Sequence, residues 1–131
     1  MAPESVSASQ IAFSVCPRLN AAGRVAQRGA EKAAELLSTE SSETAARLSE
    51  ELSLLNDSRR QTENDILSEI NEQIARNPKI LNDRVIMVAG EGWQHGVIGL
   101  AASRLTDRYG KPALVIGIEG ESAVGSARSI E

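Results

Sequence analysis

The stretch GEGWQHGVIGLAASRL, residues 90–105, places four glycines beside the only tryptophan and the only histidine of the chain and then continues in a helical pattern. RVIMVAG (84–90) before it and PALVIGIEG (112–120) after it are continuous apolar runs. Two such strands around a helix predict a βαβ unit of the α/β class, in a parallel sheet covered on both faces. SAVGSARSIE (122–131) predicts the start of a further strand or loop.

The glycine-rich turn lies where the first predicted strand meets the helix, which is where open α/β sheets bind ligands. Gly90, Gly92 and Gly96 permit close approach of a ligand to the backbone, and the start of a helix favours an anion. One interpretation is a nucleotide-binding turn, with Glu119 as the acid that binds the ribose. The spacing departs from GxGxxG, and Trp93 either stacks on a base or fills the edge of the core.

A long helix is predicted upstream of these strands. Leucines and isoleucines recur at helical spacing from Thr44 to Arg76, and no glycine or proline occurs there before Pro78. Such a helix is about 50 Å long. Its middle, NDSRRQTEND (56–65), is almost wholly polar, so the apolar stripe is interrupted. The pattern favours a connection between two bodies, with a coiled coil as the alternative.

The N-terminal third carries weaker signals. IAFSVCPRLNAAGR (11–24) contains a proline, an asparagine and a glycine, and predicts an extended piece that runs into a turn. Alanines and leucines at helical spacing predict a helix over residues 26–37. Ser41 or Ser42 is the expected N-cap of the long helix that follows.

Composition limits the class of protein. The chain is 41% hydrophobic and 24% charged, and its only rings are Phe13, Trp93 and Tyr109, which predicts a thin, aliphatic core. Cys16 is alone, so an internal disulfide is excluded. No apolar run approaches the length of about 18 residues that a membrane span needs, and the N-terminus lacks the features of a signal peptide. These features predict a cytoplasmic protein that does not contact a membrane.

Basic residues gather locally, although the net charge of −4 argues against binding nucleic acid through bulk charge. Arg18, Arg24 and Arg28 lie in one short stretch without an acid between them and favour a local anion site. GSARS (125–129) combines a flexible backbone, two hydroxyls and a guanidinium, which suits a phosphate. His95 either contacts a phosphate or is a plain hydrogen-bonding group.

Five motifs follow one another along the chain: PRLNAAGR, LSLLNDSRR, GWQHGVIGLAASRL, YGKPALVI and GSARS. In this order and approximate spacing, the chain from residue 11 onward resembles the RecJ family of single-strand-specific DNA exonucleases, which are DHH phosphoesterases. The resemblance implies a segment of a 5′ to 3′ exonuclease that hydrolyses phosphodiester bonds in DNA repair and recombination. It also implies that the glycine-rich turn faces single-stranded DNA.

The resemblance implies three parts of an α/β architecture. Residues 1–40 would end the catalytic DHH region, 41–78 would form a long connecting helix, and 79–131 would form the first half of the DHH-associated domain. In the family, aspartates and histidines of the DHH domain hold two manganese or magnesium ions that activate water. This chain has one histidine and no DHH tripeptide. We expect this segment to bind no metal and to be inactive alone, with the catalytic DHH domain as its partner.

Site residues are carried over only where the motifs match, and none of them is assigned a catalytic role. Ser126 and Arg128 match GSxRS, which in the family lies at the DNA-binding face and is implicated in gripping phosphates near the 5′ end. Arg18, Asn20 and Arg24 match PRxNAxGR, which lies near the junction of the two domains and the substrate path.

The glycine-rich turn matches the family less closely. His95 and Gly96 occupy the place of a turn in which the family commonly has histidine directly after the tryptophan, and Gln94 stands there in this chain. Both residues are expected at the DNA or phosphate contact.

Two other functions stay open. The order of strand, turn, helix and strand together with Glu119 indicates a small nucleotide-binding α/β module. The length of the helix over residues 44–76 and the acidic surface indicate a non-enzymatic helical interaction protein. An exposed helix stripe or sheet edge also leaves a homodimer open.

Overall fold

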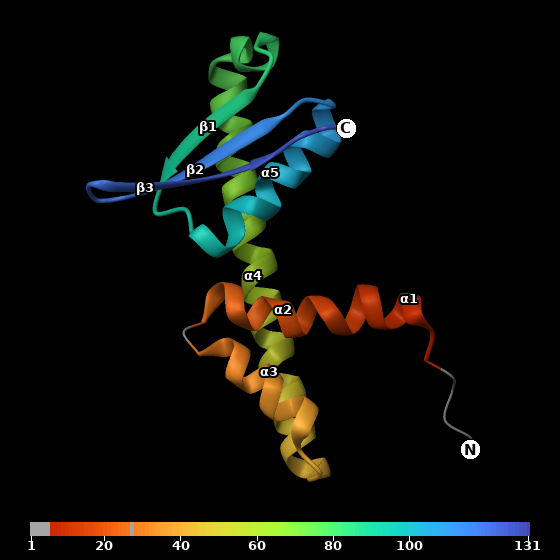
Figure 1. Cartoon of the computed structure of the whole chain (residues 1–131). Coiled ribbons are helices and arrows are strands. Elements are labelled where there is room, and N and C mark those ends of the chain that lie inside the picture. The colour runs from red at the N-terminus through yellow and green to blue at the C-terminus, as the bar shows by residue number, and fades with distance from the viewer. Residues whose placement is uncertain (1–5, 27) are drawn as a thin grey trace. The chain divides into compact units, whose positions relative to one another are not determined.

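The computed structural model describes residues 6–26 and 28–131 (Figure 1). The chain divides into two compact units, one up to Arg59 and the other from Arg60 onward. The helices are α1 (Ala8–Gln10), the π-helical turn η1 (Ile11–Val15), α2 (Cys16–Val25), α3 (Gly29–Ser38), α4 (Ser42–Arg76), the 3-10 turn η2 (Pro78–Asn82) and α5 (His95–Tyr109). The strands are β1 (Ile86–Glu91), β2 (Ala113–Glu119) and β3 (Ser122–Arg128). The predicted long helix is confirmed as α4, and the boundary between the units falls within its polar stretch.

The extended piece predicted over residues 11–24 is wrong, because this segment is helical. Ala21 and Ala22 of α2 are buried, and α3 approaches so closely that a Cβ on Gly29 would lie 1.9 Å from the Ala22 carbonyl oxygen. Pro17 is tolerated because it lies at the start of α2, directly after the wider turn η1, where it has no N–H to offer. Packing of α2 on α3 therefore outweighs the turn-forming residues.

The two helices that follow begin close to the expected places. The helix predicted over residues 26–37 begins at Gly29, after Arg28 in the left-handed conformation, and residue 27 lies outside the described residues. Ser41 is the N-cap of α4, since its Oγ accepts a hydrogen bond of 3.3 Å from the Thr44 backbone N–H. This hydroxyl satisfies one of the donors that the start of a helix leaves open.

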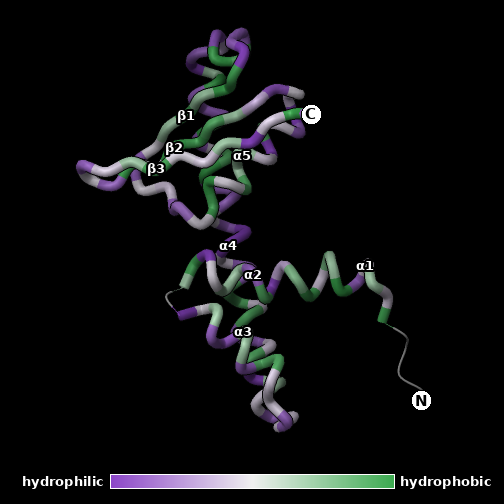
Figure 2. Tube along the Cα trace, in the orientation of Figure 1, coloured by the Kyte–Doolittle hydropathy of each residue, from purple (hydrophilic) through white to green (hydrophobic). Residues whose placement is uncertain are grey.

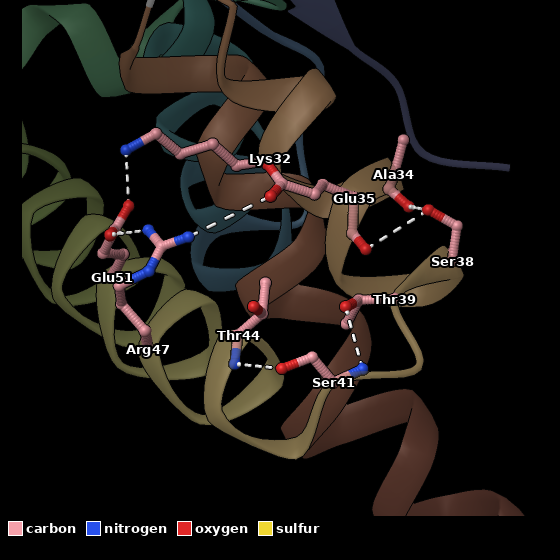
Figure 3. A network of polar contacts seen from close by, with 9 residues as sticks. All are labelled: Lys32, Ala34, Glu35, Ser38, Thr39, Ser41, Thr44, Arg47 and Glu51. Carbon is pink, nitrogen blue, oxygen red and sulfur yellow. Dashed lines mark hydrogen bonds and ion pairs between the residues drawn. The ribbon is translucent and has the colours of Figure 1, made fainter.

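Exposed charges connect α3 with the beginning of α4 (Figure 3). Glu51 accepts hydrogen bonds from Lys32 Nζ at 2.6 Å and from Arg47 Nη1 at 2.7 Å. Arg47 Nη2 also lies 4.0 Å from Glu35 Oε1. Lys32 and then Arg47 hold the pKa of the Glu51 carboxyl below its usual value.

Glu51→Gln is expected to lower the melting temperature by a few degrees at neutral pH. Because the folded pKa is depressed, the stability from Glu51 is present above the unfolded pKa of about 4.3. It is lost as the pH falls through the lower folded value. Thermal unfolding followed by circular dichroism should show the difference disappearing in strong acid. Glu50→Gln carries the same change of charge and serves as the control, and an acid-independent difference would contradict the assignment.

The sheet has the order β1-β2-β3 and is mixed. β1 and β2 are parallel, with Val88 opposite Val115, so the predicted βαβ unit is confirmed. The chain then reverses at Gly120, whose φ is +59°, and β3 returns antiparallel to β2, with Ser126 opposite Val115. Figure 2 shows this turn as hydrophilic. The segment after residue 121, expected to be a strand or a loop, is therefore a strand, and it does not extend a parallel sheet.

Helices cover one face of this sheet. α5 packs against β2 and β3 (Figure 1). The largest buried side chains of the unit come from α5, from β1 and β2 and from the second half of α4. They include Ile70, Ile86, Val97, Ile98, Leu105 and Val115. On the other face Met87 is exposed and Leu114 and Ile116 are half-buried, so the prediction of two covered faces is wrong for the described residues. Because only one face of the sheet is covered, β1 alternates between buried and exposed residues.

Candidate nucleic-acid interface

The glycines of the turn after β1 make room for the protein's own Trp93. A Cβ on Gly90 would lie 2.0 Å from the indole ring, and a Cβ on Gly117 of β2 would lie 2.4 Å from the Trp93 carbonyl oxygen. Gly92 has a φ of +71°, a conformation that residues with a Cβ rarely adopt. Trp93 is 4% exposed, so it fills the core beside the turn and does not present its ring to a base.

The second half of α4 holds this turn at two points. Trp93 Nε1 donates a hydrogen bond of 2.8 Å to Glu69 Oε2. One helical turn later, Gln73 Nε2 donates a hydrogen bond of 2.8 Å to the Ala89 carbonyl oxygen in β1. The two contacts lie on either side of Gly90, so the end of β1 and the turn that follows are both tied to the same helix.

His95 and Gly96 begin α5 directly after the turn. The His95 ring is exposed, and its Cδ2 would lie 3.4 Å from a Cβ on Gly117. The first turn of α5, which is described throughout, contains no acidic residue. The positive end of the helix dipole is therefore not opposed by a carboxylate from that turn.

The second turn of α5 meets β3 through Gly99. A Cβ on Gly99 would lie 2.9 Å from Ser126 Oγ and 3.2 Å from Arg128 Nη2, so both side chains would have to shift if this residue were not glycine. Further along, Thr106 Oγ1 donates a hydrogen bond of 3.4 Å to the Arg128 carbonyl oxygen. Gly99 lies one helical turn after His95, which places both on the same side of α5.

These residues form what we call the α5–β3 cluster: His95, Gly96, Ser126 and Arg128. Arg128 is exposed, and its Nη1 donates 2.7 Å to the Ala127 carbonyl oxygen and 3.5 Å to Ser126 Oγ. A guanidinium has five donors, so it can bind an anion in addition to these contacts. A guanidinium, a hydroxyl, an imidazole and the start of a helix are together suited to a phosphate.

The predicted residues of the first motif lie in the other unit, on α2. Asn20 and Arg24 are exposed and four residues apart, so they share one side of the helix. Arg18 is directed toward α4, where its Nε donates a hydrogen bond of 3.2 Å to Ser53 Oγ, and it also donates to the Ser14 carbonyl oxygen.

Arg28 differs from the other arginines of this stretch. Its Nη2 lies 2.7 Å from Glu31 Oε2, and this carboxylate raises the pKa of the Arg28 guanidinium above its usual value. The ion pair offsets the positive charge of Arg28, so this arginine adds little to the anion site expected from the sequence.

Two kinds of feature are absent from the described residues. Across residues 6–26 and 28–131, no three His, Cys, Asp or Glu side chains gather as they would around a metal ion. In the same ranges, no helix is both long and apolar enough to cross a bilayer.

Comparison with known proteins identifies the chain's relatives. It is 40% identical over 122 residues to the single-stranded-DNA-specific exonuclease RecJ of Bacillus subtilis, which covers 92% of this chain and 15% of that protein. The RecJ of Escherichia coli is 33% identical over 132 residues, or 98% of this chain and 22% of that protein. The chain is RecJ-like. It spans less than a quarter of the length of these curated relatives, and no family model matches it.

Solved structures agree with this likeness in fold. RecJ from Thermus thermophilus in complex with Mn²⁺ superposes with a TM-score of 0.78 at 31% identity, over 93% of the RecJ-like chain and 17% of that structure. An exonuclease RecJ bound to manganese gives a TM-score of 0.78 at 30% identity, over 95% of this chain and 30% of that structure.

In the RecJ-like chain, the four members of the α5–β3 cluster come from two motifs that are about 30 residues apart, and the fold brings them to one side of α5. The three residues from PRLNAAGR lie in the first unit and do not converge: Asn20 and Arg24 share a side of α2 that Arg18 does not. Sequence reasoning missed Gly99 and Glu69. The signal for Gly99 was its place one turn after His95, whereas nothing in the sequence pairs Glu69 with Trp93.

Proposed function

We propose that the chain holds and positions single-stranded DNA as part of a RecJ-type exonuclease, acting from the 5′ end in DNA repair and recombination in the cytoplasm. The observation that carries this proposal is the α5–β3 cluster, in which Arg128, Ser126 and the start of α5 present phosphate-binding groups together. The similarity to RecJ over almost the whole chain supports single-stranded DNA as the ligand.

Phosphodiester hydrolysis is not assigned to this segment. RecJ structures are described with Mn²⁺ or Mg²⁺. We propose that a DHH domain elsewhere in the parent protein holds the ions, and that this segment contributes substrate binding. In the parent, residues 1–40 would complete the catalytic region, 41–78 would connect it, and 79–131 would begin the DHH-associated domain.

Asn20 and Arg24, together with Arg18, form the second proposed DNA contact. The side of α2 that carries Asn20 and Arg24 is exposed. Arg18 donates a hydrogen bond to Ser53. We propose that it fixes α2 against α4 and also contributes its positive charge to this contact. This contact belongs to the first unit and the α5–β3 cluster to the second, so each is a separate site.

The nucleotide-binding alternative is less well supported. Gly90, Gly99 and Gly117 each admit atoms of the protein itself, so their lack of a Cβ is explained without a dinucleotide. Glu119 is exposed at the end of β2.

The alternative of a helical interaction protein or a homodimer predicts association that depends on concentration, and sedimentation of a strict monomer would count against it.

Arg128→Ala and Arg24→Ala are each expected to weaken the binding of a 5′-phosphorylated single-stranded oligonucleotide by roughly five- to tenfold at low salt. Losing one phosphate contact should also reduce the slope of log affinity against log salt by about one. Fluorescence anisotropy across a salt series measures both quantities, with duplex DNA and NAD as competing ligands.

Arg84→Ala is the matched control, because it removes the same charge from an exposed position outside both contacts. Equal affinities of Arg84→Ala and Arg128→Ala would mean that only overall charge matters and would contradict the proposal. Saturable binding of NAD in place of single-stranded DNA would favour the nucleotide-binding alternative.

A further inference from the structure

The indole N–H of Trp93 is buried with its ring and donates to a carboxylate on the exposed side of α4. Trp93 is 4% exposed, whereas Glu69 is an exposed residue whose Oε2 lies 2.8 Å from Trp93 Nε1. A charged acceptor makes this hydrogen bond stronger than one to a neutral group. It is a long-range contact, since 24 residues separate the two partners.

Trp93 is also confined by two strands. Its ring lies over Gly90 of β1, and its carbonyl oxygen lies over Gly117 of β2. Neither glycine has a side chain that could move aside. A shift of the indole would therefore displace the backbone of the turn. The next residues, Gln94 and His95, lead directly into α5.

We propose that Glu69 is a positioning residue for the α5–β3 cluster. By holding the indole of Trp93, it fixes the turn from which His95 and the start of α5 are directed toward the phosphate. Gln73 supports it one helical turn later by holding Ala89. This inference rests on the proposed function, because the cluster is the proposed DNA contact.

A pair of variants separates the hydrogen bond from the charge. Glu69→Ala and Glu69→Gln both remove one negative charge, so any gain in general attraction to DNA is the same in both. Only the glutamine keeps an oxygen that can accept from Trp93 Nε1. A difference between the two variants therefore reports on the hydrogen-bonding side chain and not on the charge.

The first measurement is binding of a 5′-phosphorylated single-stranded oligonucleotide by the full chain, at a temperature where circular dichroism shows all proteins folded. We expect Glu69→Gln to bind at least as tightly as the unaltered chain. Glu69→Ala should bind roughly five- to tenfold more weakly than Glu69→Gln, the loss expected for one hydrogen bond to a charged or polar acceptor. Equal affinities of the two variants would overturn the proposal.

The second measurement needs no DNA. Trp93 is the only tryptophan, so quenching of its fluorescence by acrylamide reports on this turn alone. We expect greater quenching in Glu69→Ala than in Glu69→Gln, because only the glutamine still accepts the indole N–H. If neither the variants nor the unaltered chain bind DNA, the proposed function fails, while quenching still decides the role of Glu69. Identical quenching in all three proteins would overturn that role.

Discussion

Leu52→Ala should lower the free energy of unfolding of the first unit by about 2–5 kcal/mol, the range for removing a buried leucine side chain. Leu52 is 1% exposed. Up to Arg59, the described residues bury only three other hydrophobic side chains this deeply, namely those of Ala21, Ala22 and Leu48. Because the core is so small, one leucine contributes a large share of it.

Leu54→Ala is the matched control for this experiment. It makes the same change two residues later on the same helix, at a side chain that is 64% exposed, and should change stability by less than about 0.5 kcal/mol. Urea unfolding followed by far-ultraviolet circular dichroism gives both values, and hydrogen exchange of peptides from residues 28–59 locates the loss. Similar effects of the two substitutions would mean that Leu52 is not a core residue in solution.

Gly117→Ala should destabilise the second unit by about 1–3 kcal/mol, the usual cost of overpacking. The new methyl group would lie 2.4 Å from the Trp93 carbonyl oxygen, which is a backbone atom and cannot rotate away. Either β2 or the turn must move, and the turn carries His95. We therefore expect a lower affinity for single-stranded DNA as well as a lower midpoint of unfolding.

Gly125→Ala provides the comparison on the neighbouring strand. There a Cβ would lie 3.1 Å from Leu114 Cδ1, the end of a flexible side chain that can adjust. Unfolding followed by Trp93 fluorescence should show a change below about 1 kcal/mol for this variant. A loss in Gly125→Ala as large as that in Gly117→Ala would show that the strands tolerate no side chain at all, and would remove the special role of the Trp93 carbonyl.

The sequence predicts much of this fold because its signals are local. Apolar runs identify β1 and β2, and helical spacing identifies α4 and α5. Residue type and place identify Ser41 or Ser42 as the cap of α4, and the structure has Ser41 there. The helix α2 was missed because its turn-forming residues are overruled by tertiary packing, in which Gly29 lies against Ala22. The direction of β3 depends on the turn at Gly120, and the sequence left strand and loop equally open.

The candidate site is predictable only in part. Ser126 and Arg128 were found because a short motif brings suitable groups together in sequence. Their neighbour Gly99 comes from another element, and the hydrogen bond from Trp93 to Glu69 spans 24 residues. Such contacts depend on the register of a helix against a sheet, which no local pattern contains. The contacts of these glycines with Trp93 are likewise invisible in the sequence, so the glycines of the turn suggested a ligand. In the structure they accommodate the indole and the chain's own backbone.

The three aromatic rings are divided unevenly between the units. Trp93 and Tyr109 both lie beyond Arg60, and Phe13 is the ring of the first unit. Near-ultraviolet absorbance from tryptophan and tyrosine therefore comes entirely from the second unit. A proteolytic fragment that ended before Arg60 would absorb very little in the near ultraviolet. Its yield during purification has to be followed by peptide-bond absorbance or by mass spectrometry.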